Sequence, residues 1–239
     1  MFTTVTMFSQ GFDWEYSVRL PFSIPKVYMG VQFGAATYLH TGAIQQIERQ
    51  VVCIDYNNGS GTGYYAGVIG EWWLDGDFSL LGSAAYQKVI ANFTQQTTPI
   101  PLSENNFFIS EYSLYAVLPT LSVAAAVKSR LFETKAWVFG GLTGNVIISK
   151  DVQSSETIIS PTGRVFNDGK QKRVFTDDFT SLRSFTVLPE LGIGYDASLG
   201  NGIYASPSFI ITFPIMNNSS IANWRIWSLK AGVCIFYGL

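Results

Sequence analysis

The chain has 239 residues, of which 47% are hydrophobic, 15% are aromatic and only 13% are charged. The charged fraction is about half of the ~25% that is usual in a soluble domain. A disordered chain is excluded, because disorder needs high charge and few aromatic residues. The net charge of −2, without a basic stripe, argues against nucleic acid as a partner, and two cysteines cannot build a disulfide scaffold. A well-buried β protein or a membrane β protein remains.

The N-terminal segment reads neither as a spanning helix nor as a signal peptide. No stretch of the chain reaches the ~18 consecutive apolar residues that a spanning helix needs. Residues 1–26 lack a basic start and carry Asp13, Glu15 and Arg19 where a signal peptide is apolar. We expect a mature form without its leader, in which residues 1–26 form an N-terminal arm or plug and residues 27–239 form the main domain.

Eight segments in which apolar side chains recur at every second position follow one another along the chain, each bounded by turn residues. Short connections follow the second, fourth and sixth segments, whereas long polar connections at 40–61, 89–111 and 148–183 follow the first, third and fifth. This alternation places every long loop at one end and both chain ends at the other. It predicts an all-β fold, an eight-stranded antiparallel up-and-down β-barrel. The eight segments are 27–39, 62–73, 77–88, 112–130, 135–147, 184–197, 202–213 and 224–239.

The polarity of the two strand faces decides between a soluble and a membrane barrel. In the last segment, Trp227, Leu229 and Val233 belong to a face without charge, whereas Ser228 and Lys230 belong to a small and polar face. A soluble barrel fills its interior with bulky apolar side chains and turns a charged face to water. An apolar outer face with a polar interior is typical of a barrel that spans a membrane. We therefore predict a transmembrane β-barrel.

Aromatic residues on the apolar face form two groups, each near one end of the strands. Within a strand the groups lie about eight to ten residues apart, which corresponds to roughly 20–25 Å in tilted strands and matches the ~25 Å apolar band of outer-membrane barrels. Amphipathic rings favour the membrane interface. The predicted girdles are Tyr64, Tyr86, Tyr115, Phe213 and Trp227 towards the long loops, and Trp72, Phe78, Tyr195 and Tyr237 towards the short turns.

The C-terminal segment resembles the assembly signal of bacterial outer-membrane proteins, in which a polar residue, a glycine, an apolar residue and an aromatic residue recur at set spacing. The matching residues are Lys230, Gly232, Ile235 and Tyr237, with Leu239 where a terminal aromatic is usual. Over residues 27–239 the strand pattern is similar to that of small outer-membrane β-barrel domains of the PorT-like type common in Bacteroidetes and Chlorobi, and to OmpA and OmpX in shape. The resemblance implies insertion by the outer-membrane assembly machinery and does not imply catalysis.

Five charged residues have the parity of the lumen-facing side chains and lie in the half of their strands near the short turns. Because buried charges need partners, we predict that they form an ion-pair network that closes the lumen. A selectivity gate is the alternative function for the same residues. The five are Glu71, Lys128, Arg130, Glu190 and Lys230.

Two further features invite a chemical interpretation. His40, the single histidine, falls at the outer end of the first segment, where it is either a solvated rim residue or the base of a lipid-modifying enzyme. Gly59, Gly61 and Gly63 resemble a phosphate loop, but no Lys-Ser/Thr and no helix follow, so we predict a flexible hairpin tip. We expect no metal site, no cofactor and no catalytic residue.

The resulting hypothesis is a non-enzymatic β-barrel of the bacterial outer membrane with periplasmic termini and extracellular long loops. It acts as a membrane anchor, scaffold or accessory subunit that binds a protein partner through its loops or its N-terminal arm. The lipid bilayer, with lipopolysaccharide in the outer leaflet, is its other partner. Two alternatives stay open: an enzyme that acts on outer-leaflet lipid through His40, and a narrow pore or small-ligand carrier.

Overall fold

A computed structural model describes residues 26–48, 51–103, 106–132, 134–176, 182–219 and 223–239. These ranges contain twelve β-strands. Nowhere in them is there a helix with the length and apolarity needed to cross a membrane. The expected N-terminal arm or plug lies, except for Lys26, outside the described residues. The strands are β1 (Val27–Glu48), β2 (Val51–Trp73), β3 (Phe78–Gln96), β4 (Ile100–Ser103), β5 (Asn106–Arg130), β6 (Ala136–Ile147), β7 (Asp151–Ser160), β8 (Lys172–Thr176), β9 (Phe185–Tyr195), β10 (Ala197–Gly200), β11 (Ile203–Thr212) and β12 (Asn223–Gly238).

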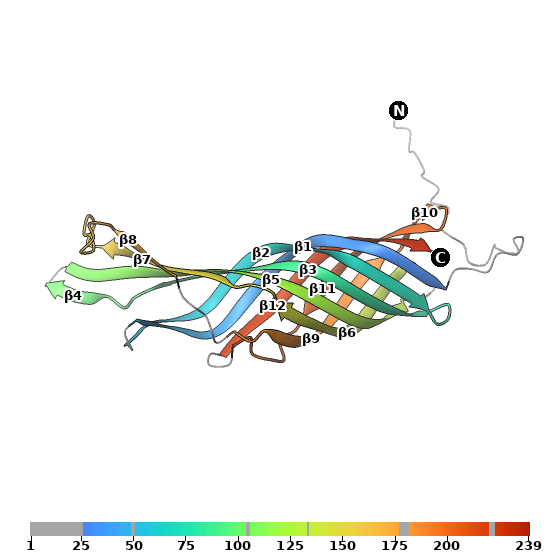
Figure 1. Ribbon diagram of the computed structural model, residues 1–239, viewed down its shortest axis with the longest axis horizontal. Coiled ribbons are helices and arrows are strands. Elements are labelled where there is room, and N and C mark those ends of the chain that lie inside the picture. The colour runs from blue at the N-terminus through green and yellow to red at the C-terminus, as the bar shows by residue number, and fades with distance from the viewer. Residues whose placement is uncertain (1–25, 49–50, 104–105, 133, 177–181, 220–222) are drawn as a thin grey trace, which may run out of the picture.

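Most of the long strands pair into a closed ring. Starting from β1, antiparallel pairing leads in turn to β2, β3, β5, β6, β9, β11 and β12, and β12 pairs with β1 again. Each of the eight segments predicted from the sequence overlaps one strand of this ring, and some of the strands extend beyond the predicted segment. In Figure 1 the ring strands wind obliquely around a tube. Closure gives every ring strand a paired neighbour on both sides and leaves no sheet edge within the ring.

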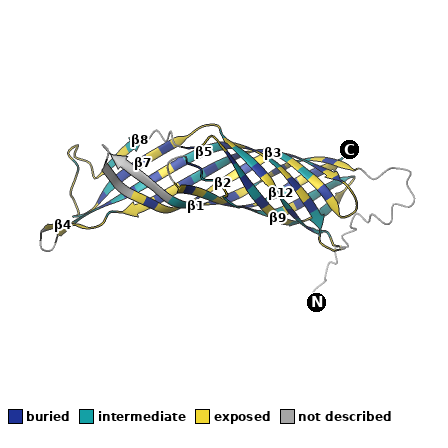
Figure 2. Cartoon of the chain, turned by 90° about the horizontal axis from the view of Figure 1, so that it is seen from below, coloured by how far each residue is buried: buried dark blue, intermediate teal, exposed yellow. Residues whose placement is uncertain are grey.

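Side chains along the ring strands alternate between exposed and buried positions, as the banding in Figure 2 shows. In β9 the outward positions hold Phe185, Leu191 and Ile193, each more than half exposed, whereas Thr186 and Glu190 point inward and are buried. The same inversion runs through the ring: large apolar side chains face outward, and the buried set includes glutamine, serine, threonine, glutamate and lysine. A water-soluble barrel has the opposite distribution.

All three predicted long loops contain β-strand, and the first two consist mostly of it. β1 runs to Glu48 and β2 starts at Val51, so that segment 40–61 forms the end of one long hairpin. β3 and β5 fill most of 89–111, and β7 and β8 occupy parts of 148–183. The loop prediction was wrong because it relied on apolar alternation. Outside an apolar environment both faces of a strand can be polar, while the backbone ladder persists.

The prediction of a flexible glycine tip was also wrong, because Gly59, Gly61 and Gly63 lie inside β2. The carbonyl oxygens of Lys88 and Ile90 approach Gly63 and Gly61 so closely that they occupy the place of a β-carbon. The β2–β3 register is interrupted here, between Ser60–Asn92 and Tyr65–Gln87. Glycine is needed at these positions because β3 approaches the backbone of β2 itself.

The short connections and the ends of the ring lie together. At the β2–β3 turn, the Asp75 carboxylate accepts hydrogen bonds from the backbone amides of Asp77 and Phe78, at 2.8 and 2.7 Å. At the same end, the Leu239 amide donates to the Val27 carbonyl at 3.0 Å, which ties the end of the last ring strand to the start of the first. The long hairpins project from the opposite end, and β4, β7 and β8 lie farthest from the C-terminus (Figure 1).

We predict that Gly61→Val destabilises the ring by about 1–3 kcal/mol, because its side chain must displace the Ile90 carbonyl. Gly82→Val is the matched control, since Gly82 is in β3 and a β-carbon added there would meet no atom within 4 Å. Urea unfolding in detergent, followed by tryptophan fluorescence, measures the difference. Equal midpoints for the two variants would contradict this account of the glycine run.

Candidate functional site

A buried ion cluster closes the ring near the short turns. The Lys128 ammonium on β5 lies 3.0 Å from Glu71 Oε1 on β2 and 2.7 Å from Asp196 Oδ2, just after β9. The Glu71 and Lys128 side chains are almost completely buried, at 0% and 2% exposure. β3 lies between β2 and β5. Its residue Leu81 pairs with Glu71 on one side and with Ala126 on the other. Lys128 is two residues after Ala126 and has the same parity, so this register brings both charges together in the lumen.

Neighbouring donors complete the coordination of both carboxylates. Glu71 accepts hydrogen bonds from Ser79 Oγ, at 2.6 Å, and from the Tyr204 hydroxyl. Asp196 accepts hydrogen bonds from Trp137 Nε1 at 2.8 Å and from Ser206 Oγ at 2.7 Å. A buried charge is tolerated when it is both paired and hydrogen-bonded, and this cluster meets both conditions.

Aromatic rings surround the cations of this cluster. Lys128 Nζ lies 5.3 Å from the centroid of the Trp73 ring, 5.0 Å from Trp137 and 5.7 Å from Tyr204. The Arg130 guanidinium lies 5.1 Å from the Trp73 centroid. Cation–π contacts of this kind stabilise a cation where water is scarce. Arg130, which the sequence placed in the ion-pair network, is thus held on an aromatic face.

Glu190 and Lys230 are buried elsewhere in the lumen. They flank β11, where Glu190 is opposite Thr212 and Lys230 is opposite Ile210. Among the described residues, no ion pair within 4.0 Å joins them to each other or to the Lys128 cluster. Of the five predicted residues, the structure therefore joins only Glu71 and Lys128 directly. Asp196, which completes the cluster, was not among the five, although it has the inward parity of Glu190.

Two small cavities, each lined by polar and apolar side chains, occupy the lumen beyond the cluster. One, of about 60 Å³, is lined by Gln32, Gln87, Glu190 and Lys230 among others; the second, of about 40 Å³, shares Gln87 and Lys230 with the first. A water needs roughly 10–15 Å³ measured in this way, so the cavities have room for a few waters each. The Tyr38 hydroxyl, which borders the second cavity, is buried without a partner in the described part of the protein. The described part of the lumen therefore has space for water in places.

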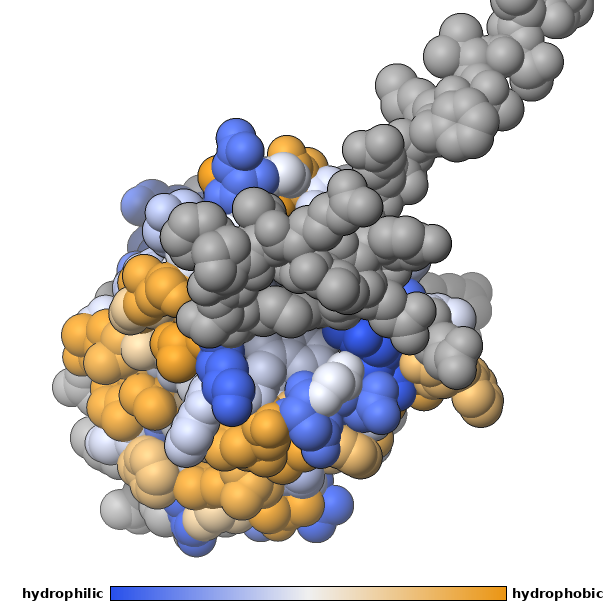
Figure 3. All heavy atoms as spheres, turned by 90° about the vertical axis from the view of Figure 1, so that its right-hand side faces the viewer, coloured by the Kyte–Doolittle hydropathy of each residue, from blue (hydrophilic) through white to orange (hydrophobic). Residues whose placement is uncertain are grey.

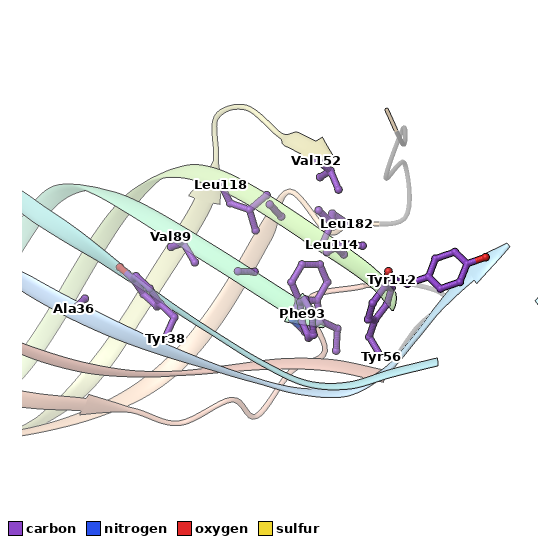
Figure 4. Close-up of a cluster of buried hydrophobic side chains, with 13 residues drawn as sticks. Ala36, Tyr38, Tyr56, Val89, Phe93, Tyr112, Leu114, Leu118, Val152 and Leu182 are labelled. Atoms are coloured by element: carbon purple, nitrogen blue, oxygen red, sulfur yellow. The ribbon is translucent and has the colours of Figure 1, made fainter. Parts of the chain in front are cut away.

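An apolar cluster closes the lumen towards the long hairpins. Figure 4 shows Tyr38, Tyr56 and Phe93 with aliphatic side chains of β5 in this cluster, which also includes Trp224. Phe93 contacts Tyr56 and Trp224 at centroid distances of 5.9 and 5.8 Å. All four aromatic side chains are at most 2% exposed, so they form a buried aromatic plug.

His40 lies inside this plug, at 1% exposure, and the interpretation as a solvated rim residue was wrong. Its Nε2 donates to the Ile90 carbonyl at 3.0 Å, and its Nδ1 accepts from Trp224 Nε1 at 3.2 Å. Both ring nitrogens are therefore engaged, and neither has a lone pair left to take a proton from a hydroxyl. The imidazole holds the Ile90 carbonyl at the point where the β2–β3 register is interrupted.

The predicted girdle residues point outward, and apolar residues gather on the left and lower flanks in the view onto the short-turn end, with hydrophilic residues between them (Figure 3). Tyr64 and Tyr86 have centroids 6.4 Å apart, and Phe213 and Trp227 pack edge to face at 5.5 Å. Tyr115 differs from the others. It pairs with Asn92 and Gln153 of β7, beyond the last β5–β6 pair, and so lies on the projecting hairpins. The other outward aromatics are Trp72, Phe78, Tyr195 and Tyr237.

The residues of the predicted assembly signal lie on β12 or directly after it. Ile235, Tyr237 and Leu239 are exposed on the outer face, whereas Lys230 and Gly232 belong to the inward face. Gly232 packs under the Tyr65 hydroxyl, at the position where a β-carbon would stand. The apolar part of the motif is thus available on the outside of the ring.

Two β-hairpin arrays project beyond the ring. One is the end of the β1–β2 hairpin, where Ile44 pairs with Tyr56 and Glu48 with Val51. In the other, the N-terminal part of β5 pairs with β7 instead of β6. β8 then pairs with β7, and β4 pairs with the start of β5. Its far end is fastened by cation–π contacts from Arg164 to Phe108 and from Arg173 to Phe166, at 5.7 and 3.9 Å. Large apolar side chains are exposed at this far end, namely Ile100, Leu102, Phe107 and Val165.

A metal site is not found in the described part of the chain, where no three His, Cys, Asp or Glu side chains are grouped. The described lumen thus contains ion pairs, aromatic rings and small cavities of mixed lining. Its arrangement is suited to closing and stiffening the ring. The surfaces available for binding are the outer face and the projecting hairpins.

No protein-family model matches the chain, and no curated protein matches it. Among solved structures, it is similar to the attachment invasion locus protein Ail of Yersinia pestis, with 10% identity over 89% of this chain and 99% of that chain and a TM-score of 0.35. The outer membrane protein OprG of Pseudomonas aeruginosa has 11% identity over 90% and 98% of the two chains, with a TM-score of 0.40. The outer membrane protease OmpT of Escherichia coli has 9% identity over 91% and 99%, with a TM-score of 0.32. The PorT-like resemblance stays a prediction.

We predict that Lys128→Met lowers the free energy of unfolding by about 3–5 kcal/mol, because it leaves the buried Glu71 carboxylate and the partly exposed Asp196 carboxylate without their shared cation. The matched control is Lys135→Met, which removes a cation at the same end that forms no ion pair within 4.0 Å among the described residues. Thermal unfolding in detergent, followed by the mobility shift on gels, compares the two. A Lys128 variant as stable as the control would show that the ion cluster does not support the ring.

Proposed function

We propose that this chain is an eight-stranded transmembrane β-barrel of the bacterial outer membrane, which acts as a non-enzymatic anchor for projecting β-hairpins that bind another component. The ring strands β1, β2, β3, β5, β6, β9, β11 and β12 are the eight. The observation that carries the proposal is the inverted polarity: Val31, Val123 and Ile193 are at least half exposed, while Glu71 and Lys128 are buried. Such a distribution suits a barrel whose surroundings are hydrocarbon.

The orientation follows from the lengths of the connections. Outer-membrane barrels have short periplasmic turns and long extracellular loops. By this rule the short turns and the C-terminus face the periplasm, and the hairpins of β1–β2 and of β4, β5, β7 and β8 face outward from the cell. An anchor fits the lumen better than a pore does, because the ion cluster and the aromatic plug close it at both ends.

The hairpins are the proposed binding element. They extend the ring by continuous β-structure, so a partner meets a stiff surface that requires little ordering on binding. Exposed apolar residues at the far end, such as Ile100 and Phe107, are unfavourable in water and are typical of a surface that is covered by another molecule. We propose that this end contacts a protein partner, in line with a scaffold or accessory subunit.

Cysteine labelling on intact cells tests the orientation. In a variant without the two native cysteines, Thr157→Cys in β7 is expected to react with a membrane-impermeant maleimide, because it lies on a projecting hairpin. Gly76→Cys, in the exposed β2–β3 turn, is expected to react only after the outer membrane is permeabilised. Labelling of Gly76→Cys on intact cells would contradict the proposed orientation.

Co-purification in mild detergent tests the anchor function. We expect a stoichiometric partner to be retained by wild type and by the control Leu199→Ser, an exposed apolar residue at the short-turn end. The triple variant Ile100→Ser, Leu102→Ser, Phe107→Ser is expected to lose it, while its thermal stability stays unchanged. A strictly solitary monomer, or equal retention by both variants, would contradict the proposal.

A further inference from the structure

The outer face changes in character on one side of the ring, directly above the aromatic girdle. On β12, β1, β2 and β3, the outward positions below the girdle are apolar or small, whereas most of those above it are polar, with the exposed Leu39 and the half-buried Ile90 between them. The register places Thr37 opposite Thr62 and Thr41 opposite Asn58, with Ser60 between Asn58 and Thr62 on β2. We call these residues the hydroxyl band: Thr37, Thr41, Asn58, Ser60 and Thr62.

A cation flanks the hydroxyl band on each side. Arg225 on β12 is opposite Thr41 and is exposed, and Lys88 on β3 occupies the outward position next to that of Ile90. Arg225 donates from Nε to Asn217 Oδ1 at 3.3 Å, so its terminal nitrogens can donate elsewhere. Lys88 is half-buried along the wall, as a long cation is when its stem covers apolar surface.

Carboxylates are missing from this stretch of the described surface. Above the hydroxyl band, the first acid on β2 is Asp55, which pairs with Gln45 on the projecting hairpin. Below it, Glu71 faces the lumen. The short-turn end of the ring differs, because the acids Asp75 and Asp77 are exposed there together with cations. The hydroxyl band is therefore a cationic, donor-rich surface, and the opposite end of the ring is not.

The hydroxyl band lies at the height where a membrane places its headgroups. Thr62 and Tyr64 are successive outward positions of β2, Lys88 follows Tyr86 on β3, and Arg225 lies one outward position beyond Trp227 on β12. Aromatic girdles mark the membrane interface, so groups directly beyond them meet phosphates and sugars of the outer leaflet. Lys and Arg at this depth bind anionic headgroups as charges, and hydroxyls supply further hydrogen bonds.

We propose that the hydroxyl band, with Lys88 and Arg225, is a binding surface for the phosphate-bearing headgroup of an outer-leaflet glycolipid. This inference rests on the proposed transmembrane orientation and goes beyond it in naming the lipid chemistry and the side of the barrel. The two cations hold phosphate oxygens, and the threonine and serine hydroxyls between them donate to the sugar and to the remaining phosphate oxygens. The lipid is bound from the bilayer side and does not enter the lumen.

Native mass spectrometry of the full chain in detergent tests the surface. Diphosphoryl lipid A is the probe, with the same lipid stripped of its phosphates and inorganic phosphate as comparisons. The double variant Lys88→Gln, Arg225→Gln is expected to bind diphosphoryl lipid A about tenfold or more weakly than wild type. The matched control Lys26→Gln, Lys135→Gln removes two cations at the short-turn end and is expected to bind as wild type does.

Each other outcome decides against the surface. Equal binding by the two double variants, equal binding of the dephosphorylated lipid, or saturation of wild type by inorganic phosphate alone would overturn the inference. Co-flotation with lipid vesicles is measured in parallel on all three proteins. Failure of wild type to float would contradict the transmembrane proposal itself, whereas floating proteins that ignore the phosphates would contradict the lipid surface alone.

Discussion

The exclusion of water from the outer face is the constraint on which the rest of the proposed structure depends. In hydrocarbon, each unsatisfied backbone amide or carbonyl costs several kcal/mol, so strands cross only as a closed ring. The same medium reverses the usual placement of side chains. Val123 and Leu191 face outward, towards the proposed lipid, and Glu71, Lys128 and Gln32 are enclosed by the ring.

The closed ring also restricts which side chains the lumen can hold. A narrow ring brings opposing side chains together near the axis, and the charged ones among them must find partners there. Lys128 meets this demand with two carboxylates and three aromatic rings, and His40 meets it with a carbonyl and an indole. At both ends the lumen is filled by these groups, which leaves the outer face and the projecting hairpins as the surfaces that a partner can reach.

The strand faces were predictable from the sequence, because a period of two residues assigns each side chain to one side. The outward aromatics and the inward positions of Glu71, Lys128, Glu190 and Lys230 follow from parity alone. Parity does not give the height of each residue along the ring axis, because this height depends on the register between strands. For this reason Glu190 and Lys230 were grouped with the Lys128 cluster, Asp196 was overlooked, and Tyr115 was placed in a girdle.

The projecting hairpins were missed for a different reason. Their strands mix polar and apolar residues on both faces, so the regular apolar alternation that predicts the ring strands is lost there. The glycine run of β2 was predicted to be a hairpin tip, because glycines in a sequence suggest a turn. In the structure these glycines permit close contact between β2 and β3. His40 sits at the boundary between these regions, and its burial depends on aromatic residues from β3 and β12 that are distant in sequence.

Spin labels at two adjacent residues of β5 test the central claim most directly. With the protein reconstituted in lipid vesicles, a label at Val123→Cys, on the outer face, is predicted to be relaxed strongly by dissolved oxygen and weakly by a water-soluble nickel complex. A label at Ser122→Cys, which faces the lumen, is predicted to be shielded from oxygen in the bilayer. Strong relaxation of the Val123 label by the nickel complex would place that face in water and contradict the account.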